Sequence, residues 1–170
     1  MGMDQPPTPP AGGSGAPDWG DMKNKVAAAQ GPDRMLLIAG LVFLVSTFLP
    51  WYRVTVRGFG SASDNAWGLG GLGVLAALFG VAAFGVAVAG LSGAVKVPSA
   101  ALLSLGIAGG TLLFTLLRFL FKPGGDAAAS ISILTAGAIK ITRGIGLWIG
   151  LVVAIVMTAA AYQKYKAASA

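Results

Sequence analysis

The sequence predicts an all-α membrane protein, an antiparallel bundle of four transmembrane helices with a disordered N-terminal tail. Of its 170 residues, 55% are hydrophobic and only 11% are charged, and the mean hydropathy is +0.77. Soluble domains carry about 25% charged residues. The apolar residues also form four stretches between Met35 and Tyr162, each about as long as a bilayer is thick. A β-barrel would need alternating segments, whereas these stretches are continuously apolar, so the backbone amides in lipid must be paired within helices.

The first part of the chain is predicted to be a disordered tail followed by one span. Residues 1–33 are rich in Pro and Gly and poor in aliphatic side chains, so they cannot bury enough apolar surface to fold. We expect this tail to be cytoplasmic. The first span is predicted over residues 35–52, where 18 residues would reach about 27 Å. Pro50 ends this span as a helix breaker, and Trp51-Tyr52 follow at the level of the headgroups.

Three further spans complete the predicted bundle. They are expected over residues 67–94, 99–121 and 144–162, with a short basic tail at 163–170. Spans two and three must be antiparallel neighbours, because Lys96-Val97-Pro98 is a tight connection. In the loop between spans one and two, Arg53 to Arg57 alternate polar and β-branched residues, which is a weak strand signal, and turn residues follow.

Residues 126–143 allow more than one interpretation. The stretch 127–138 is apolar, but about twelve residues are too few to span a membrane. The segment could lie along the interface, form a small hairpin, or extend the fourth span as a longer tilted helix. We expect a short helical or extended segment on the outer surface.

The basic residues around the first span predict cytoplasmic N- and C-termini. Lys23, Lys25 and Arg34 precede the span, and Arg53 and Arg57 follow it. Positively charged residues near a span favour the cytoplasmic side. The two faces of the whole bundle are almost balanced in basic residues, so this orientation depends on the first span.

Small residues recur along the predicted spans and predict close helix packing. In lipid, helices associate where small side chains let their backbones approach, and such stripes serve that purpose. We expect these Gly/Ala-rich faces to pack the bundle internally, with a second face available to a homo-oligomer or a protein partner. The stripes are Ala77, Val81, Gly85, Ala89 and Gly93 in span two, Gly106 and Gly110 in span three, and Gly146, Gly150, Ala154 and Thr158 in span four.

Arg118 is the one ionisable side chain well inside a predicted span. A charge within the membrane is costly and suggests a function, such as lining a cavity or binding an anionic headgroup. Because Arg118 lies one turn from Lys122 at the helix end, the simpler interpretation is a side chain that snorkels to the headgroups. Asp64 or Asp126 could pair with Arg118 if the outer loops fold over the bundle.

Aromatic side chains mark the outer boundary of spans one, two and four. Trp51, Tyr52, Trp67 and Trp148 lie at these ends. Trp and Tyr are enriched at membrane interfaces, so we interpret them as an aromatic belt. The alternative is a hydrophobic recognition cap above the helices.

The missing residue types argue against enzymatic chemistry. The chain contains no Cys, His or Glu, and its Asp residues lie in the tail and loops. Acid–base, metal-dependent and thiol chemistry need such groups placed together, so we expect no catalytic residue, metal or cofactor. The net charge of +6 comes from basic residues at helix ends, which indicates contact with the lipid bilayer and not with nucleic acid.

Three short motifs form a recognisable set. They are Leu49-Pro50-Trp51-Tyr52, Ser63-Asp64-Asn65-Ala66-Trp67, and Arg143-Gly144-Ile145-Gly146-Leu147-Trp148. Together they resemble small, largely uncharacterised four-helix membrane proteins of high-GC Gram-positive (actinobacterial) bacteria, over about residues 34–162. The resemblance implies a plasma-membrane protein with a small first outer loop and carries no assigned activity. Related proteins often have Glu after the Trp of the second motif, where this chain has Gly68.

We therefore expect a non-enzymatic integral membrane protein that acts as a scaffold or accessory subunit of a membrane or cell-envelope complex. It would work through its helix faces and its outer aromatic and basic loops. The alternative is a small oligomeric transporter or channel in which Arg118 lines a path for an anion or a lipid.

Overall fold

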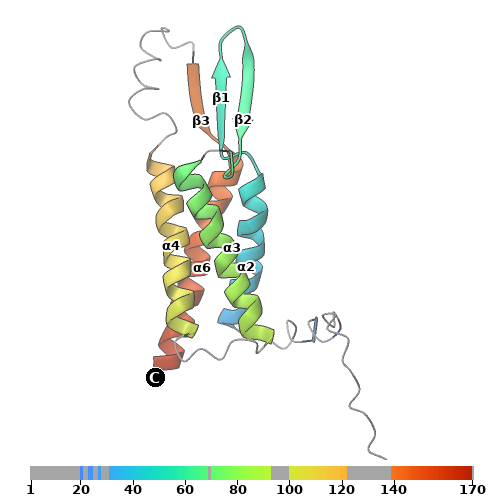
Figure 1. Cartoon of the computed structure of the whole chain (residues 1–170), viewed down its shortest axis with the longest axis vertical. Helices are drawn as coiled ribbons and strands as arrows, with labels where there is room; N and C mark the ends of the chain where they lie inside the picture. Colours follow the sequence, from blue (N-terminus) through green and yellow to red (C-terminus); the bar gives the residue numbers. More distant parts are fainter. Residues whose placement is uncertain are drawn as a thin grey trace, which may run out of the picture.

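Four helices and a small sheet make up the computed structural model, which describes residues 20, 23–24, 27, 31–68, 70–92, 100–121 and 139–169. The helices run side by side along the long axis, and the sheet stands at one end of them (Figure 1). The helices are α2 (Pro32–Phe48), α3 (Gly71–Ser92), α4 (Ala100–Leu120) and α6 (Ile145–Ser169). The strands are β1 (Tyr52–Val56), β2 (Gly60–Asp64) and β3 (Ile139–Arg143).

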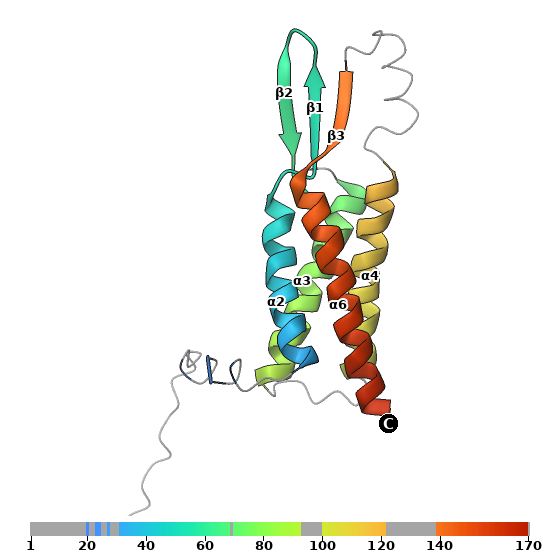
Figure 2. The ribbon, with the colours of Figure 1, turned by 180° about the vertical axis from the view of Figure 1, so that it is seen from behind.

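The helices form an antiparallel bundle in which each helix contacts two neighbours. Helix α2 packs against α3 and α6, and α4 packs against the same two helices from the other side (Figures 1 and 2). The start of α2 and the end of α6 meet at the end far from the sheet, where Lys164 Nζ lies 2.7 Å from Asp33 Oδ1. The two ends of the helical core therefore lie together.

Three of these helices are long and apolar enough to cross a membrane. The segments are Gly71–Leu91 in α3, Ala101–Leu120 in α4 and Ile145–Ser169 in α6. Helix α2 has 17 residues, a length of about 25 Å, against about 30 Å for a bilayer core. The chain is thus a multi-pass membrane protein with three candidate spans, and α2 is shorter than the first span expected from the sequence.

The predicted end of the first span, at residue 52, is wrong. Helix α2 stops at Phe48, and Leu49 is extended, with φ −75° and ψ 158°. The following Pro50 explains this conformation, because its ring disfavours helical geometry in the preceding residue. Helix α2 also begins at Pro32, a residue well suited to a first turn, so the end of the predicted tail is helical. Most of that tail lies outside the described residues.

The second and fourth spans also have different bounds from those expected. Helix α3 begins at Gly71, not at residue 67, because the Asn65 side chain accepts hydrogen bonds from the N–H groups of Trp67 and Gly68 and holds a turn there. Helix α6 continues to Ser169, so the predicted basic tail at 163–170 is helical as far as that residue. Its Ala-rich end favours helix, and Lys164 is held by Asp33.

The sheet corrects the all-α prediction. It is three-stranded and antiparallel, in the order β2-β1-β3. The alternating residues after Trp51 form β1, and the hairpin to β2 turns at Gly58 and Gly60, whose φ angles are 87° and 102°. The end of the ambiguous segment 126–143 forms β3, an extended conformation, while residues 122–138 lie outside the described residues.

The strand register gives the sheet an apolar face and a basic face. Directly opposed residues point to the same face. Val54 of β1 lies opposite Ala62 and Ile141, and Val56 lies opposite Ile139. The other face carries polar and basic side chains from all three strands, namely Arg53, Thr55, Ser61, Ser63, Lys140 and Thr142.

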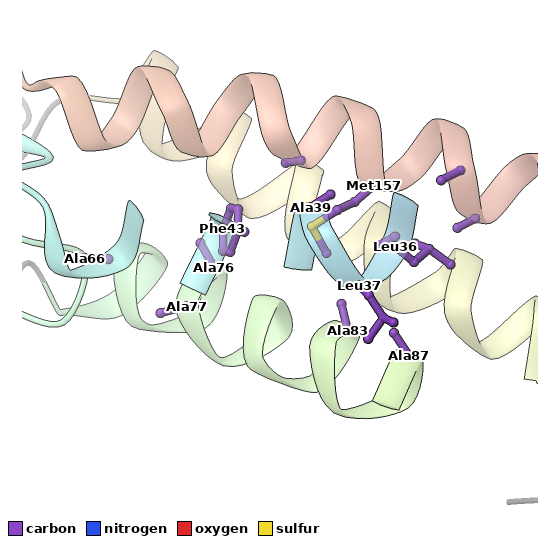
Figure 3. Close-up of a cluster of buried hydrophobic side chains, with 14 of the residues drawn as sticks. Leu36, Leu37, Ala39, Phe43, Ala66, Ala76, Ala77, Ala83, Ala87 and Met157 are labelled. Atoms are coloured by element: carbon purple, nitrogen blue, oxygen red, sulfur yellow. The ribbon is translucent and has the colours of Figure 1, made fainter. Parts of the chain in front are cut away.

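Small side chains of α3 let the other helices approach, as predicted, but on a different face. Figure 3 shows Leu36, Leu37, Ala39 and Phe43 of α2 packed with alanines of α3 and with Met157 of α6. The buried residues Gly73, Ala76, Gly80, Ala83 and Ala87 of α3 follow alternating steps of three and four, and Ala77 is buried beside them.

The stripe predicted in span two is therefore confirmed at Ala77, which is buried, and wrong at Val81 and Gly85, which are exposed. A strict four-residue step drifts by about 40° each time around a helix, so Val81 and Gly85 face outward. Gly93 lies outside the described residues. The stripe predicted in span four is confirmed for Gly146, Gly150 and Ala154, which are buried.

Candidate functional site

The sheet is fixed to the bundle through Trp51. This side chain is completely buried, and its Nε1 donates a hydrogen bond to the Ser46 carbonyl oxygen at 2.8 Å. The Trp51 N–H donates to the Asp64 carbonyl oxygen at 2.8 Å, and the Trp51 carbonyl oxygen accepts from Gly144 N–H at 2.7 Å. Trp51 is thus a structural centre joining α2, β2 and the start of α6, which differs from its expected place in an interfacial belt.

Tyr52 connects the sheet to α4. Its side chain is 1% exposed, and its hydroxyl donates a hydrogen bond to the Arg118 carbonyl oxygen. The Arg118 Cζ atom lies 5.2 Å from the centroid of the Tyr52 ring, a distance at which a cation is attracted to the ring face. The structure therefore brings together Tyr52 and Arg118, which are 66 residues apart in the sequence.

Arg118 is buried in the last turn of α4, with 7% of the residue exposed. This burial differs from the snorkelling interpretation, in which the guanidinium would reach the headgroups. In the part of the chain that the structure describes, Arg118 Nε and Nη2 have no hydrogen-bond partner, and neither does Thr115 Oγ1 one turn earlier. Buried polar groups are almost always paired, so three unpaired atoms in one place mark a candidate site.

Asp64, the suggested partner of Arg118, lies elsewhere. It ends β2 opposite Tyr52, and no ion pair joins it to Arg118 among the described residues. Its carboxylate covers Gly68, where an added Cβ would overlap Asp64 Oδ1. A side chain at position 68 would therefore require the Asp64 carboxylate to move. Asp126, the other suggested partner, lies outside the described residues.

The two other tryptophans that the structure describes have different environments. Trp67 is half-buried, donates from Nε1 to Thr47 Oγ1 at 3.1 Å, and lies against the Phe48 ring. Trp148 is 49% exposed on α6 and makes an edge-to-face contact with Phe119 at 4.8 Å between centroids. Of the three tryptophans within the described residues, Trp148 has the exposure expected of an interfacial aromatic residue.

Arg143 and Phe119 were not identified as site residues from the sequence. Arg143 lies opposite Tyr52 across β1 and β3. Its Cζ atom lies 4.4 Å from the Phe119 ring centroid, and its Nε donates to the Phe119 carbonyl oxygen at 3.1 Å. In the sequence, Arg143 is recognisable only as a basic residue directly before an apolar span. Its contact with Phe119 is evident only once β3 is paired with β1.

The site is electropositive. At the sheet end, the described residues carry one acidic side chain, Asp64, against five basic ones: Arg53, Arg57, Arg118, Lys140 and Arg143. Guanidinium groups recognise carboxylate and phosphate oxygens, so Arg118 and Arg143, where the sheet meets α4, are suited to binding an anion. Comparisons of the chain with protein-family models, curated proteins and solved structures found no match.

Tyr52→Phe should reveal the buried hydroxyl through pH-dependent stability. Burial raises the pKa of the Tyr52 phenol above its usual value of about 10, although the charges of Arg118 and Arg143 oppose this shift. Below pH 10 the variant should lose about 1 kcal/mol of unfolding free energy, because the Arg118 carbonyl loses its donor.

Above pH 10 the unfolded chain releases the phenolic proton while the folded protein keeps it, so the wild type should lose stability and Tyr52→Phe should lose less. Denaturant unfolding in detergent at pH 8 and at pH 11 measures both effects. The exposed Tyr162→Phe variant is the control and should follow the wild type. If Tyr52→Phe and the wild type lose the same amount of unfolding free energy between pH 8 and pH 11, the prediction is contradicted.

Proposed function

We propose that the protein is a non-enzymatic integral membrane protein that serves as a scaffold or accessory subunit of a membrane or cell-envelope complex. The observation that supports this proposal is the sheet, which projects beyond the ends of the helices (Figures 1 and 2). Strand β2 lies at one edge of it and is exposed at all five positions. A part of the chain that projects in this way can meet another protein without disturbing the bundle.

Strand β2 is a suitable place for a partner strand. An edge strand presents unpaired backbone N–H and C=O groups, and proteins usually protect such an edge with Lys, Pro or a bulge. β2 has the sequence Gly-Ser-Ala-Ser-Asp, without Lys or Pro. We propose that an extended segment of the partner pairs with β2, and that the basic face beside it, with Arg53 and Lys140, favours an acidic partner.

The proposed topology has four spans, with both termini in the cytoplasm and the sheet outside the plasma membrane. Helix α2 has no charged residue after Arg34, and its length is at the lower limit for a span. Its outward side chains are apolar and exposed, as expected for contact with lipid, among them Ile38, Leu41, Val45 and Phe48. The resemblance to actinobacterial four-helix membrane proteins supports the same topology.

Photo-crosslinking from β2 tests the proposal. A photoreactive amino acid at Ser61, on the exposed edge strand, should give an adduct with one protein when the full chain is irradiated in its native membrane. The same group at Leu113, an exposed apolar position on α4, is the matched control and should react mainly with lipid. If Ser61 gives no more protein adduct than Leu113, the sheet is not the docking element.

A second candidate is a small oligomeric transporter or channel with Arg118 on the path of an anion or a lipid. The unpaired guanidinium donors of Arg118 favour this candidate. Purification in mild detergent separates the two proposals. A stoichiometric larger partner supports the scaffold, whereas a homo-oligomer whose anion or lipid flux in vesicles is lost in Arg118→Gln supports the transporter.

A further inference from the structure

We propose that Arg118, Thr115 and Arg143 form a phosphate-binding site where the sheet meets the bundle. This inference is independent of the scaffold proposal, because it concerns the buried side of the junction and not the exposed strand β2. The ligand is a phosphate group, carried by a lipid or free in solution.

Arg118 supplies the main argument. Its side chain is more than nine-tenths buried, yet Nε and Nη2 have no acceptor in the described parts of the chain. A buried charge without a partner is strongly destabilising, and proteins normally pair it or use it. Because Nε and one terminal nitrogen lie along one edge of the guanidinium, they are placed to bind two oxygens of one anion.

Thr115 adds an independent unpaired group to the same face. It lies three residues before Arg118 on α4, a spacing that puts two side chains next to each other on a helix. Its hydroxyl is fully buried and has no hydrogen-bond partner within the described residues. Thr111, one turn further from the sheet, bonds instead to the Ile107 carbonyl oxygen. The unpaired hydroxyl at Thr115 is thus available to a third ligand oxygen.

Arg143 makes the site doubly positive. It lies opposite Tyr52 in the sheet, and Arg118 lies over the Tyr52 ring, so both arginines are close to the same residue. The described acidic residue at this end, Asp64, points to Gly68. Among the described residues no carboxylate forms an ion pair with either guanidinium, and two such positive groups match the charge of a phosphate better than that of a neutral ligand.

The depth of the site fits a phosphate at the membrane surface. Arg118 lies in the last turn of α4, and Phe119 beside it contacts the exposed Trp148. Tryptophan at the end of a span marks the headgroup level. The guanidinium is carried on a long, flexible side chain, which can turn toward a phosphate at this level.

Thermal unfolding of the purified full-length protein in a non-ionic detergent tests the site. The probes are phosphatidylglycerol, diacylglycerol with the same acyl chains as the phosphate-free control, and inorganic phosphate against chloride at equal ionic strength. Wild-type protein should gain several degrees in Tm with a phosphate-bearing probe and none with diacylglycerol, because a ligand that binds the folded state stabilises it.

Three variants test whether the stabilisation by phosphate depends on the proposed site. Arg118→Gln and Thr115→Val should each raise the probe concentration needed for half of the shift about ten-fold. Thr115→Val keeps the side-chain shape, so it gives the answer even if Arg118→Gln fails to fold. Arg53→Gln is the matched control, since Arg53 is next to Tyr52 but exposed on the opposite face of the sheet, and it should change the concentration less than two-fold.

The outcomes separate the sources of the phosphate. A shift with phosphatidylglycerol alone identifies a lipid headgroup, and an equal shift with inorganic phosphate identifies a free anion. The proposal is overturned if neither probe stabilises the wild type, or if the shift persists unchanged in Thr115→Val and in any folded Arg118→Gln. Crosslinking from Ser61 is a separate measurement, so the thermal-unfolding result can be interpreted even if the scaffold proposal fails.

Discussion

Gly144→Ala should separate the start of α6 from the sheet and cost about 3 kcal/mol or more of unfolding free energy, at or beyond the upper end of overpacking effects. A Cβ on Gly144 would overlap the Pro50 carbonyl oxygen and lie 2.7 Å from the Pro50 carbonyl carbon. Both atoms belong to backbone that is held by the hydrogen bond from Gly146 N–H to the Pro50 oxygen, so no side-chain rotation can relieve the overlap. The hydrogen bond from Gly144 N–H to the Trp51 oxygen should be lost as well.

Denaturant unfolding in detergent measures this effect, and Gly106→Ala is its control. Gly106 lies within α4, and a Cβ there would have no neighbour within 4 Å. Alanine favours helix over glycine by about 1 kcal/mol, so the control should be as stable as the wild type or slightly more stable. If Gly144→Ala unfolds at the wild-type midpoint, the contact between Pro50 and Gly144 is not tight in the folded protein.

The helices were largely predictable from the sequence because the signals that define them are local. Residues 99–121 predicted α4 to within a residue at each end, since Pro98 and Lys122-Pro123 bound a continuous apolar run. The first span was placed too far along the chain. Apolar and aromatic residues continue past Phe48, but Pro50 already forces the chain out of the helix.

The sheet and the site were not predictable in the same way, because they depend on pairing between distant segments. Alternation after Trp51 indicated a strand, but the partner strand β3 begins more than 80 residues later and carries an equally weak pattern. The contact between Tyr52 and Arg118 likewise joins distant segments, β1 and α4. The sequence predicts Tyr52 at a helix end among the headgroups and Arg118 as a side chain that snorkels to the headgroups, so it gives no reason to expect the Tyr52 ring against Arg118.

Trp51→Ala should be the most damaging truncation at the junction, with a cost of about 3–5 kcal/mol. The Trp51 indole is completely buried between the end of α2 and the start of α6, and its Nε1 is paired with the Ser46 oxygen. Alanine would leave a cavity of nearly the size of an indole, and the Ser46 carbonyl oxygen would keep only its hydrogen bond from Leu49 N–H. Trp51→Phe keeps much of the side-chain volume but not the N–H, so its unfolding free energy should lie between those of Trp51→Ala and the wild type. Trp148→Ala, at an exposed position, should cost much less.

Trp51→Ala should also weaken the attachment of the sheet, because Trp51 joins β2 to the start of α6 through its backbone hydrogen bonds. Arg53 and Thr142 are opposed across β1 and β3, and the chain has no cysteine of its own. Cysteines placed at these two positions should therefore react together with a short bifunctional thiol reagent in the otherwise wild-type protein. The yield should fall at least several-fold when Trp51→Ala is added and should stay unchanged with Trp148→Ala. A constant yield in both backgrounds would mean that β1 and β3 hold together without the buried indole, and that Trp51 stabilises only the helices.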